Sequence, residues 1–144
     1  NVSSSVYAEE QTILDLFADQ VRGDSSSIAL VFEGATMSYG DLDAASNRLG
    51  HYLRELGVGP ESLVGICLDR GMEMVVGILG ILKSGGAYVP IDPDYPLDRI
   101  SYMVNDSGVS CVVSSVALSD RLAGSCQVIE VDGSDRDLID ACST

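Results

Sequence analysis

The feature that most constrains this chain is residues 72–82, where every position except one is apolar or glycine (MEMVVGILGIL). A helix that is apolar on nearly every side has to be buried within a larger structure. Glu73 near its start and Lys83 near its end stand at the favourable poles of the helix dipole. Gly85 and Gly86 predict the helix end, because glycine readily adopts the left-handed conformations found there. We therefore expect the chain to fold around this helix.

A strand and a stiff elbow follow this helix. Residues 87–91 (AYVPI) predict a strand, and Pro90 places it at an edge, a bulge or a strand end because proline has no N–H to donate. Residues 92–96 (DPDYP) predict the elbow, since each proline biases the preceding residue towards extended geometry. Pro96 is suited to open the next helix, which should end near Gly108. The inner face of that helix is expected to consist of Ile100, Met103 and Val104.

The remaining chain alternates between strand and helix patterns. Amphipathic helices are predicted at 12–21 and 38–56, each opened by a capping-box pattern, and strands at 28–32 (buried), 36–37, 63–68, 110–114 and 127–131. The buried stripe of the second helix should be Leu42, Ala45, Leu49, Tyr52 or Leu53, and Leu56. Residues 116–125 look irregular, 132–144 look like an acidic tail, and 1–6 like a serine-rich linker or tail. Alternation from residue 63 onward predicts an α/β fold, with helices layered on a largely parallel sheet.

Composition narrows the class of protein. The chain has 144 residues, 46% of them hydrophobic, which suits one globular domain. Its formal net charge of −14 argues against nucleic acid or an anionic membrane as partner. No leader pattern and no bilayer-spanning apolar run are present, and the cysteines (Cys67, Cys111, Cys126 and Cys142) show no CxxC spacing. We therefore expect a cytoplasmic protein with free thiols.

Two motifs resemble one enzyme family. Residues 82–103 (LKSGGAYVPIDPDYPLDRISYM) closely resemble the second core motif of nonribosomal peptide synthetase adenylation domains. Residues 37–42 (MSYGDL) resemble the first core motif of that family, usually Leu-Thr/Ser-Tyr-x-Glu-Leu, with Asp41 in place of glutamate. The resemblance covers about residues 7–113. Acyl-CoA ligases and luciferases share the fold but seldom carry the full GGAYVPIDPxYP string, so amino-acid adenylation is the better interpretation.

The resemblance implies a partial domain. Residues 7–144 would be the front portion of the large N-terminal subdomain of an adenylate-forming enzyme, preceded by the linker or tail at 1–6. The whole enzyme would use Mg·ATP to convert an amino acid into aminoacyl-AMP and then pass it to the phosphopantetheine thiol of a carrier protein. In the family, the groups for ATP, the amino acid and catalysis come from later motifs. This chain is therefore expected to hold no catalytic, cofactor-binding or metal-binding residue, and to be inactive alone.

The residues themselves offer only weak candidates for a phosphate site. No G-x-x-x-x-G-K-[ST] motif is present, and Lys83, which lies among glycines between Gly77 and Gly86, is better explained by helix termination. Ser38 is expected to cap a helix, and His51, the only histidine, cannot seed a histidine-rich metal site.

Acidic residues around the elbow suggest acid–base or Mg²⁺ chemistry, but a structural role is favoured. On that interpretation Asp94 caps the following helix, and Asp98 interacts favourably with the dipole of that helix. Arg99 then pairs with a neighbouring carboxylate or carbonyl. Tyr88 and Tyr95 could face a ligand, but tyrosines usually bury the ring and leave the hydroxyl in water.

Two alternatives remain open. The chain could be a binding module that docks a partner through residues 84–102, because some family members bind a small MbtH-like protein near the helix that begins at Pro96. Leu97 stands there where many relatives have alanine. It could also be a truncated acyl-CoA ligase relative. The expected partners are the remainder of the adenylation domain and its synthetase module. Self-association is also expected, because a parallel sheet needs both faces covered.

Overall fold

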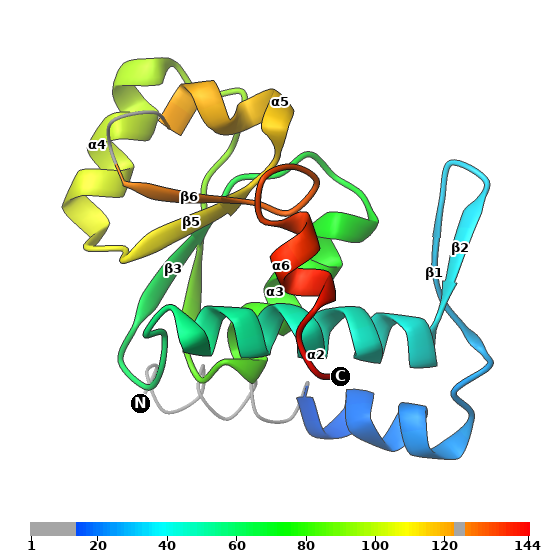
Figure 1. The fold of residues 1–144 in the computed structure, drawn as a ribbon. Coiled ribbons are helices and arrows are strands. Elements are labelled where there is room, and N and C mark those ends of the chain that lie inside the picture. Colours follow the sequence, from blue (N-terminus) through cyan, green and yellow to red (C-terminus); the bar gives the residue numbers. More distant parts are fainter. Residues whose placement is uncertain (1–13, 123–125) are drawn as a thin grey trace, which may run out of the picture.

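A computed structural model describes residues 14–122 and 126–144 of the chain, drawn in Figure 1. Its main sheet has four parallel strands in the order β4-β3-β5-β6. These strands are β3 (Leu63–Ile66), β4 (Ala87–Pro90), β5 (Cys111–Ser114) and β6 (Gln127–Glu130). A separate antiparallel hairpin joins β1 (Ile28–Phe32) to β2 (Ala35–Ser38). The predicted α/β class with a largely parallel sheet is confirmed.

Helices cover both faces of the main sheet (Figure 1). The first helix comprises residues 14–23. It is followed by α2 (Tyr39–Glu55), α3 (Met72–Lys83), α4 (Leu97–Ser107), α5 (Val116–Ser119) with the 3₁₀ turn η1 (Asp120–Leu122), and α6 (Arg136–Asp140). The helices α2 and α3 lie on one face of the sheet, and α4 and η1 on the other.

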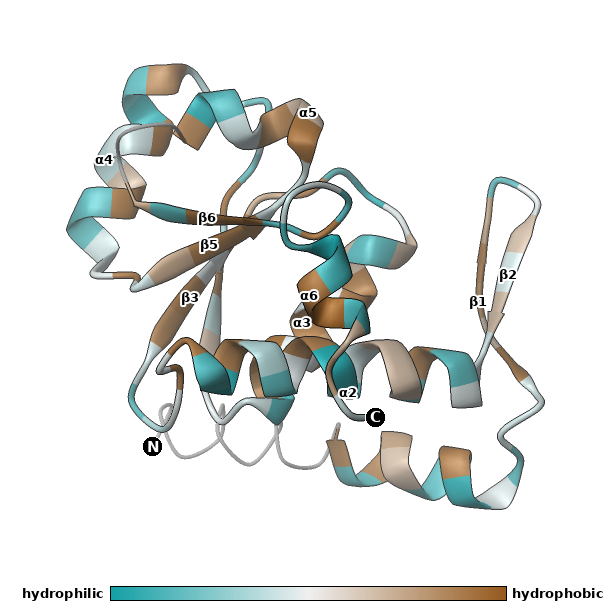
Figure 2. Cartoon of the chain, viewed as in Figure 1, coloured by the Kyte–Doolittle hydropathy of each residue, from teal (hydrophilic) through white to brown (hydrophobic). Residues whose placement is uncertain are grey.

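The sheet separates two apolar clusters. Cys111 and Val113 of β5 point towards the α2 and α3 side, whereas Val112 between them points towards α4. All four residues of β5 are buried, as expected for a strand covered on both faces. Figure 2 shows this distribution as hydrophobic colouring along β3, β5 and β6 between the helices. The run CVVS therefore has no polar alternation because neither face meets water.

The α2–α3 contact depends on glycine. A Cβ atom at Gly80 would lie 2.7 Å from Cδ2 of Leu49, so α3 approaches α2 at a point where a side chain does not fit. The second half of α3 is buried, including Leu79 and Ile81, whereas Met74 and Val76 pack against the same core from the first half of the helix and are only partly buried. The expected burial of this helix is therefore confirmed for its second half, while its first turns are only partly covered.

Several expected helix ends are confirmed. The Oγ atom of Ser38 accepts a hydrogen bond from the Asp41 backbone N–H at 3.1 Å and caps α2. Gly85 and Gly108 have φ values of 94° and 74°, which are the left-handed conformations expected after α3 and α4. Pro90 ends the edge strand β4, and α4 begins directly after Pro96.

Other expectations are wrong. The strand at 28–32 is not buried, because β1 and β2 project from the body and leave Val31 69% exposed. The stretch at 116–125 is not irregular, since α5 and η1 occupy its described part. The segment at 132–144 is not a loose tail, because α6 buries Ile139 against the core. Leu56 is exposed rather than part of the buried stripe, and the predicted Thr12 cap lies outside the described residues.

Candidate functional site

The strand order places a topological switch point at the centre of the sheet. The chain moves from β3 to β4 on one side and then returns to place β5 on the other side of β3. The connections that leave β3 and β5 therefore run to opposite faces, α3 to one and α5 to the other. In open parallel sheets, ligands bind in the crevice outside the carboxyl ends of the strands at such a point. A ligand site is therefore expected at this edge.

A cleft of about 470 Å³ lies at this edge. Its lining includes Asp69 and Arg70 after β3, Glu73 in the first turn of α3, Ser115 after β5 and Asp132 after β6. Burial, and then the neighbouring Asp132 carboxylate, raise the pKa of Glu73, while Arg136 acts in the opposite direction. With Glu33, the cleft is lined by four carboxylates and one guanidinium, so it repels anions and does not suit the phosphates of a nucleotide.

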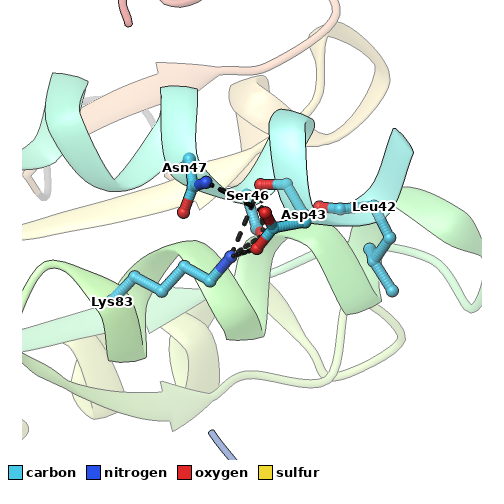
Figure 3. A network of polar contacts seen from close by, with 5 residues as sticks. All are labelled: Leu42, Asp43, Ser46, Asn47 and Lys83. Carbon is cyan, nitrogen blue, oxygen red and sulfur yellow. Dashed lines mark hydrogen bonds and ion pairs between the residues drawn. The ribbon is translucent and has the colours of Figure 1, made fainter. Parts of the chain in front are cut away.

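Lys83, the candidate phosphate-binding lysine, is already engaged. Its Nζ atom lies 2.8 Å from Oδ1 of Asp43 and 2.7 Å from Oγ of Ser46 (Figure 3). The same atom lies over the ring of Phe17, 5.0 Å from its centroid. The same Ser46 hydroxyl donates a hydrogen bond to the Leu42 carbonyl at 2.8 Å. This network joins the C-terminal end of α3 to α2. Lys83 therefore has a structural role and does not face a glycine-rich loop.

The charged residues of the elbow after β4 and of the start of α4 make other contacts than expected. The Oδ1 atom of Asp92 accepts a hydrogen bond from the Asp94 backbone N–H at 2.9 Å, which fixes the turn. Asp94 does not cap α4. The N-cap residue of this helix is Pro96, and no side chain makes a capping hydrogen bond there. Arg99 lies over the ring of Tyr95, 4.9 Å from its centroid. The predicted cap at Asp94 is therefore wrong, and so is the predicted pairing of Arg99, whose contact is a cation–π interaction.

No metal centre forms within residues 14–122 and 126–144, where no group of three or more His, Cys, Asp or Glu side chains could hold an ion. The Nδ1 atom of His51 lies 2.6 Å from the carbonyl oxygen of Ser143, so the ring nitrogen must donate to that acceptor.

Within residues 14–122 and 126–144, no helix is long and apolar enough to cross a membrane.

The thiols are not activated nucleophiles. Burial raises the pKa of Cys67 and of Cys111 to about 11, and it also raises the pKa of Cys126 and Cys142. A thiol with a raised pKa carries little thiolate at neutral pH, and the thiolate is the reactive form. The structure contains all four as free cysteines.

One polar pair was missed by the sequence analysis. The Tyr52 hydroxyl in α2 donates a hydrogen bond to Oδ1 of Asp135, and Oδ2 of Asp135 accepts from the Glu130 backbone N–H at 2.8 Å. The pair is 83 residues apart in sequence, and no local motif announces it. It fixes the segment between β6 and α6 against α2, which is a structural role.

Comparisons with known proteins identify the family of the chain. Residues 17–141 match the family described as AMP-binding enzyme. The chain is 43% identical over 132 residues to gramicidin S synthase 2 of Brevibacillus brevis, which covers 92% of this chain and 3% of that protein. It is 46% identical over 114 residues to bacitracin synthase 3 of Bacillus licheniformis, which covers 79% of this chain and 2% of that protein.

Solved structures agree with the sequence relatives. The nonribosomal peptide synthetase FmoA3, in its alpha-methyl-L-serine-AMP bound form, superposes with a TM-score of 0.80 at 32% identity, covering 88% of this chain and 14% of FmoA3. O-succinylbenzoate coenzyme A synthetase of Bacillus subtilis shares the fold, with a TM-score of 0.77 at 20% identity, covering 89% of this chain and 26% of that one. The chain thus spans only a small part of the proteins it resembles. It belongs to the AMP-binding enzyme family and matches the N-terminal part of a nonribosomal peptide synthetase adenylation domain.

Proposed function

We propose that this chain forms the opening layers of a larger domain that activates an amino acid with Mg·ATP as aminoacyl-AMP and transfers it to a carrier-protein phosphopantetheine. The observation that carries the proposal is the family match over residues 17–141, combined with relatives that are peptide synthetases many times longer than this chain. On this proposal residues 1–6 are a linker or tail and residues 7–144 belong to the N-terminal subdomain.

The proposed role of these residues is structural. This role is supported by the cations of the described residues, most of which already have a partner within the chain. Arg22 pairs with Asp19, Lys83 with Asp43 and Arg136 with Asp140, while Arg54 donates to the Lys83 carbonyl and Arg99 stacks on Tyr95. Phosphate transfer needs cations or backbone N–H groups that converge on the phosphates. We infer that residues elsewhere in the whole enzyme bind ATP and Mg²⁺ and select the amino acid.

The test is amino-acid-dependent exchange of pyrophosphate into ATP. The natural full-length chain that contains this sequence should catalyse exchange with at least one amino acid, because adenylate formation is reversible. Residues 1–144 alone should give none, and calorimetric titration with Mg·ATP should show no binding tighter than about millimolar, since the electrostatic contributions of several phosphate-binding groups are missing. Saturable micromolar binding by residues 1–144 would place part of the site in this chain and contradict the proposal.

The expected partners are the remainder of the synthetase module and, as a second candidate, a small MbtH-like protein on α4. The observation that favours this docking is the solvent exposure of two α4 residues, Leu97 (55%) and Tyr102 (66%). Purified MbtH-like protein should bind the full-length chain in calorimetry, and Tyr102→Ala should weaken that binding. The acyl-CoA ligase alternative is tested by the second half-reaction of the full-length chain, since such a ligase would transfer its acyl group to coenzyme A and not to a carrier protein.

A further inference from the structure

The two faces of the β1–β2 hairpin differ in exposure. On one face the ring of Phe32 lies against the start of α3, where a Cβ atom at Gly71 would be 3.6 Å from Cε1 of Phe32. On the other face Val31 is 69% exposed, and Thr36, its neighbour across the strand pair, is exposed as well. Among the residues that the structure describes, no third strand joins β1 or β2. One face of the hairpin is therefore packed, whereas its outer face and both of its edges are open.

The turn of the hairpin determines which backbone groups point outward. Residues 33–34 make a two-residue turn with φ values of 50° and 84°, which fits the type I′ class. Phe32 and Ala35 flank this turn, and in such a hairpin the flanking residues form a hydrogen-bonded pair. The next pair, Val31 and Thr36, is then of the non-hydrogen-bonded kind, because the two kinds alternate. The N–H and C=O of Val31 therefore point into the open edge of β1, and those of Thr36 point into the open edge of β2.

These edges lack the usual protection against further pairing. Natural edge strands are protected by charged side chains, proline or bulges. β1 (IALVF) and β2 (ATMS) contain no charged residue and no proline. The register shift in β1 lies between Ile28 and Leu30, so residues 30–32 present a regular edge. An edge of this kind readily accepts an additional strand.

The strand that covers such an edge has to be present as the protein folds. An unprotected edge that stayed open between encounters with a transient partner would lead to aggregation. A strand of the same polypeptide meets the edge at a high effective concentration, whereas a second copy or a separate protein depends on its own concentration. O-succinylbenzoate coenzyme A synthetase, which shares the fold, is matched over only 26% of its chain. Most of a polypeptide of this kind therefore lies outside the matched part and folds together with it.

We propose that, in the whole enzyme, a strand of the same polypeptide from outside these 144 residues adds to the open edge of β1. It bonds to the N–H and C=O of Val31 and packs an apolar side chain beside that of Val31. The edge of β1 is favoured because its exposed side chains, Ile28 and Val31, are large and apolar. The exposed side chains of β2, Ala35 and Thr36, are small or polar. The addition turns a marginally stable hairpin into a sheet of three or more strands, and it rests on the proposed function because it requires a larger domain.

The test is amide hydrogen exchange of the natural full-length chain, read at single residues by mass spectrometry with gas-phase fragmentation. The Val31 amide should exchange at least about 100-fold more slowly than in an unfolded peptide, because the added strand holds its N–H in a ladder hydrogen bond. The Thr36 amide lies on the other edge and should exchange close to the unpaired rate, which makes it the internal control. The protection of Val31 should not change when the protein is diluted.

Three results of this measurement would overturn the proposal. A Val31 amide that exchanges as fast as that of Thr36 would show an open edge in the full-length chain. Protection that falls on dilution would show that a second copy supplies the strand. A Thr36 amide slower than that of Val31 would place the added strand on β2.

Proline variants of the full-length chain test the same edge independently. Val31→Pro removes the outward N–H of β1 and keeps the pairing with β2, because proline is tolerated where the N–H points away from the partner strand. Thr36→Pro is the matched control and makes the same change on β2. The Leu30 and Phe32 amides should exchange about tenfold faster in Val31→Pro than in Thr36→Pro, since a hairpin without a third strand is only marginally stable. Equal rates in the two variants would contradict the proposal, and the wild-type exchange decides the question if Val31→Pro does not fold.

Pyrophosphate exchange by the same full-length sample reports on the proposed function separately. An active chain with an open β1 edge would refute the added strand alone. A protected β1 edge in a chain that shows no amino-acid-dependent exchange would refute the activity alone.

Discussion

Gly80 determines how closely α3 approaches α2. A Cβ atom at this position would lie 2.7 Å from Cδ2 and 2.9 Å from Cβ of Leu49, distances that real Cβ contacts essentially never show. Leu49 is itself only 1% exposed and cannot move aside without disturbing the core around it. The glycine is therefore required by packing, although glycine is a poor helix former.

We expect Gly80→Ala to lower the free energy of unfolding by about 1–3 kcal/mol, because overpacking outweighs the roughly 1 kcal/mol by which alanine favours a helix. Urea unfolding followed by circular dichroism measures this change. Gly59→Ala is the control, since no heavy atom lies within 4 Å of its added Cβ, and it should be close to neutral. A Gly80→Ala protein as stable as the wild type would show that the two helices are not in such close contact.

The cysteines should be slow to react in the folded protein. Burial raises the pKa of Cys67 and of Cys111 to about 11, so little thiolate forms at pH 8. We expect mass spectrometry after iodoacetamide treatment to show four adducts in denaturant without reductant, because all four thiols are free. Under native conditions Cys67 and Cys111 should be the last to react. Fewer than four adducts in denaturant would reveal a disulfide, and equal native rates for all four would contradict the role of burial.

At the scale of elements, α6 depends on the rest of the molecule. It has five residues, which is too short for a helix to be stable on its own in water. Ile139 packs in the core, and Asp135, directly before α6, binds the Tyr52 hydroxyl and the Glu130 backbone N–H. Tertiary contacts therefore order a segment whose sequence alone resembles an acidic tail.

The Tyr52–Asp135 hydrogen bond should make stability depend on alkaline pH. Burial first, and then Asp135, raise the pKa of Tyr52 from 10.0 to about 12. The folded state therefore holds this proton more tightly than the unfolded state does. Its contribution to the free energy of unfolding is fully present below about pH 10 and is lost as the pH rises towards about 12.

We expect Tyr52→Phe to cost about 1–3 kcal/mol at pH 7, because Asp135 loses a charged hydrogen bond. Unfolding in urea at several pH values measures this difference, which should shrink above pH 10. The buried thiols titrate in a nearby range but are present in both proteins, so their effect cancels. Tyr88→Phe is the control, as no hydrogen bond of its hydroxyl is found among the described residues. A difference that stays constant up to pH 12 would contradict the raised pKa of Tyr52.

At the scale of the whole molecule, exposed apolar side chains occur on several helices and also on the β1–β2 hairpin, where they stand on a strand pair. The β1–β2 hairpin projects from the body (Figure 1), and Ile28 and Val31 are 59% and 69% exposed. The edge strand β4 is incompletely covered. A two-stranded hairpin is only marginally stable by itself, and open edges pair with other strands.

We expect residues 1–144 to self-associate through the hairpin. Val31→Lys should reduce association, because lysine on an edge strand disfavours further pairing. Val116→Lys, on the surface of α5 and outside any sheet, should have no such effect. Light scattering over a range of concentrations measures the mass. A monomeric wild-type chain at high concentration, or an equal effect of both substitutions, would contradict the hairpin as the contact.

The sequence determined the elements that have strong local signals. The apolar run at 72–82, the Ser38–Asp41 cap and the glycines at 85 and 108 predicted α2, α3 and α4 because periodicity, capping and left-handed conformations are local properties. The motifs at 37–42 and 82–103 indicated the family. The resemblance, which implies that later motifs supply the groups for ATP and catalysis, led to the expectation of no catalytic site in these 144 residues, and this remains a prediction.

Only the tertiary structure decided which groups meet across long distances in sequence. Lys83 with Asp43 and Tyr52 with Asp135 pair 40 and 83 residues apart, and nothing local distinguishes these side chains from their exposed neighbours. Likewise, α6 is ordered because Ile139 packs in the core, and β1 is exposed because the hairpin projects from the body. The elbow shows the same limit, because Arg99 had a carboxylate and an aromatic ring within reach along the chain. Its choice of the Tyr95 ring depends on side-chain directions that only the folded backbone sets.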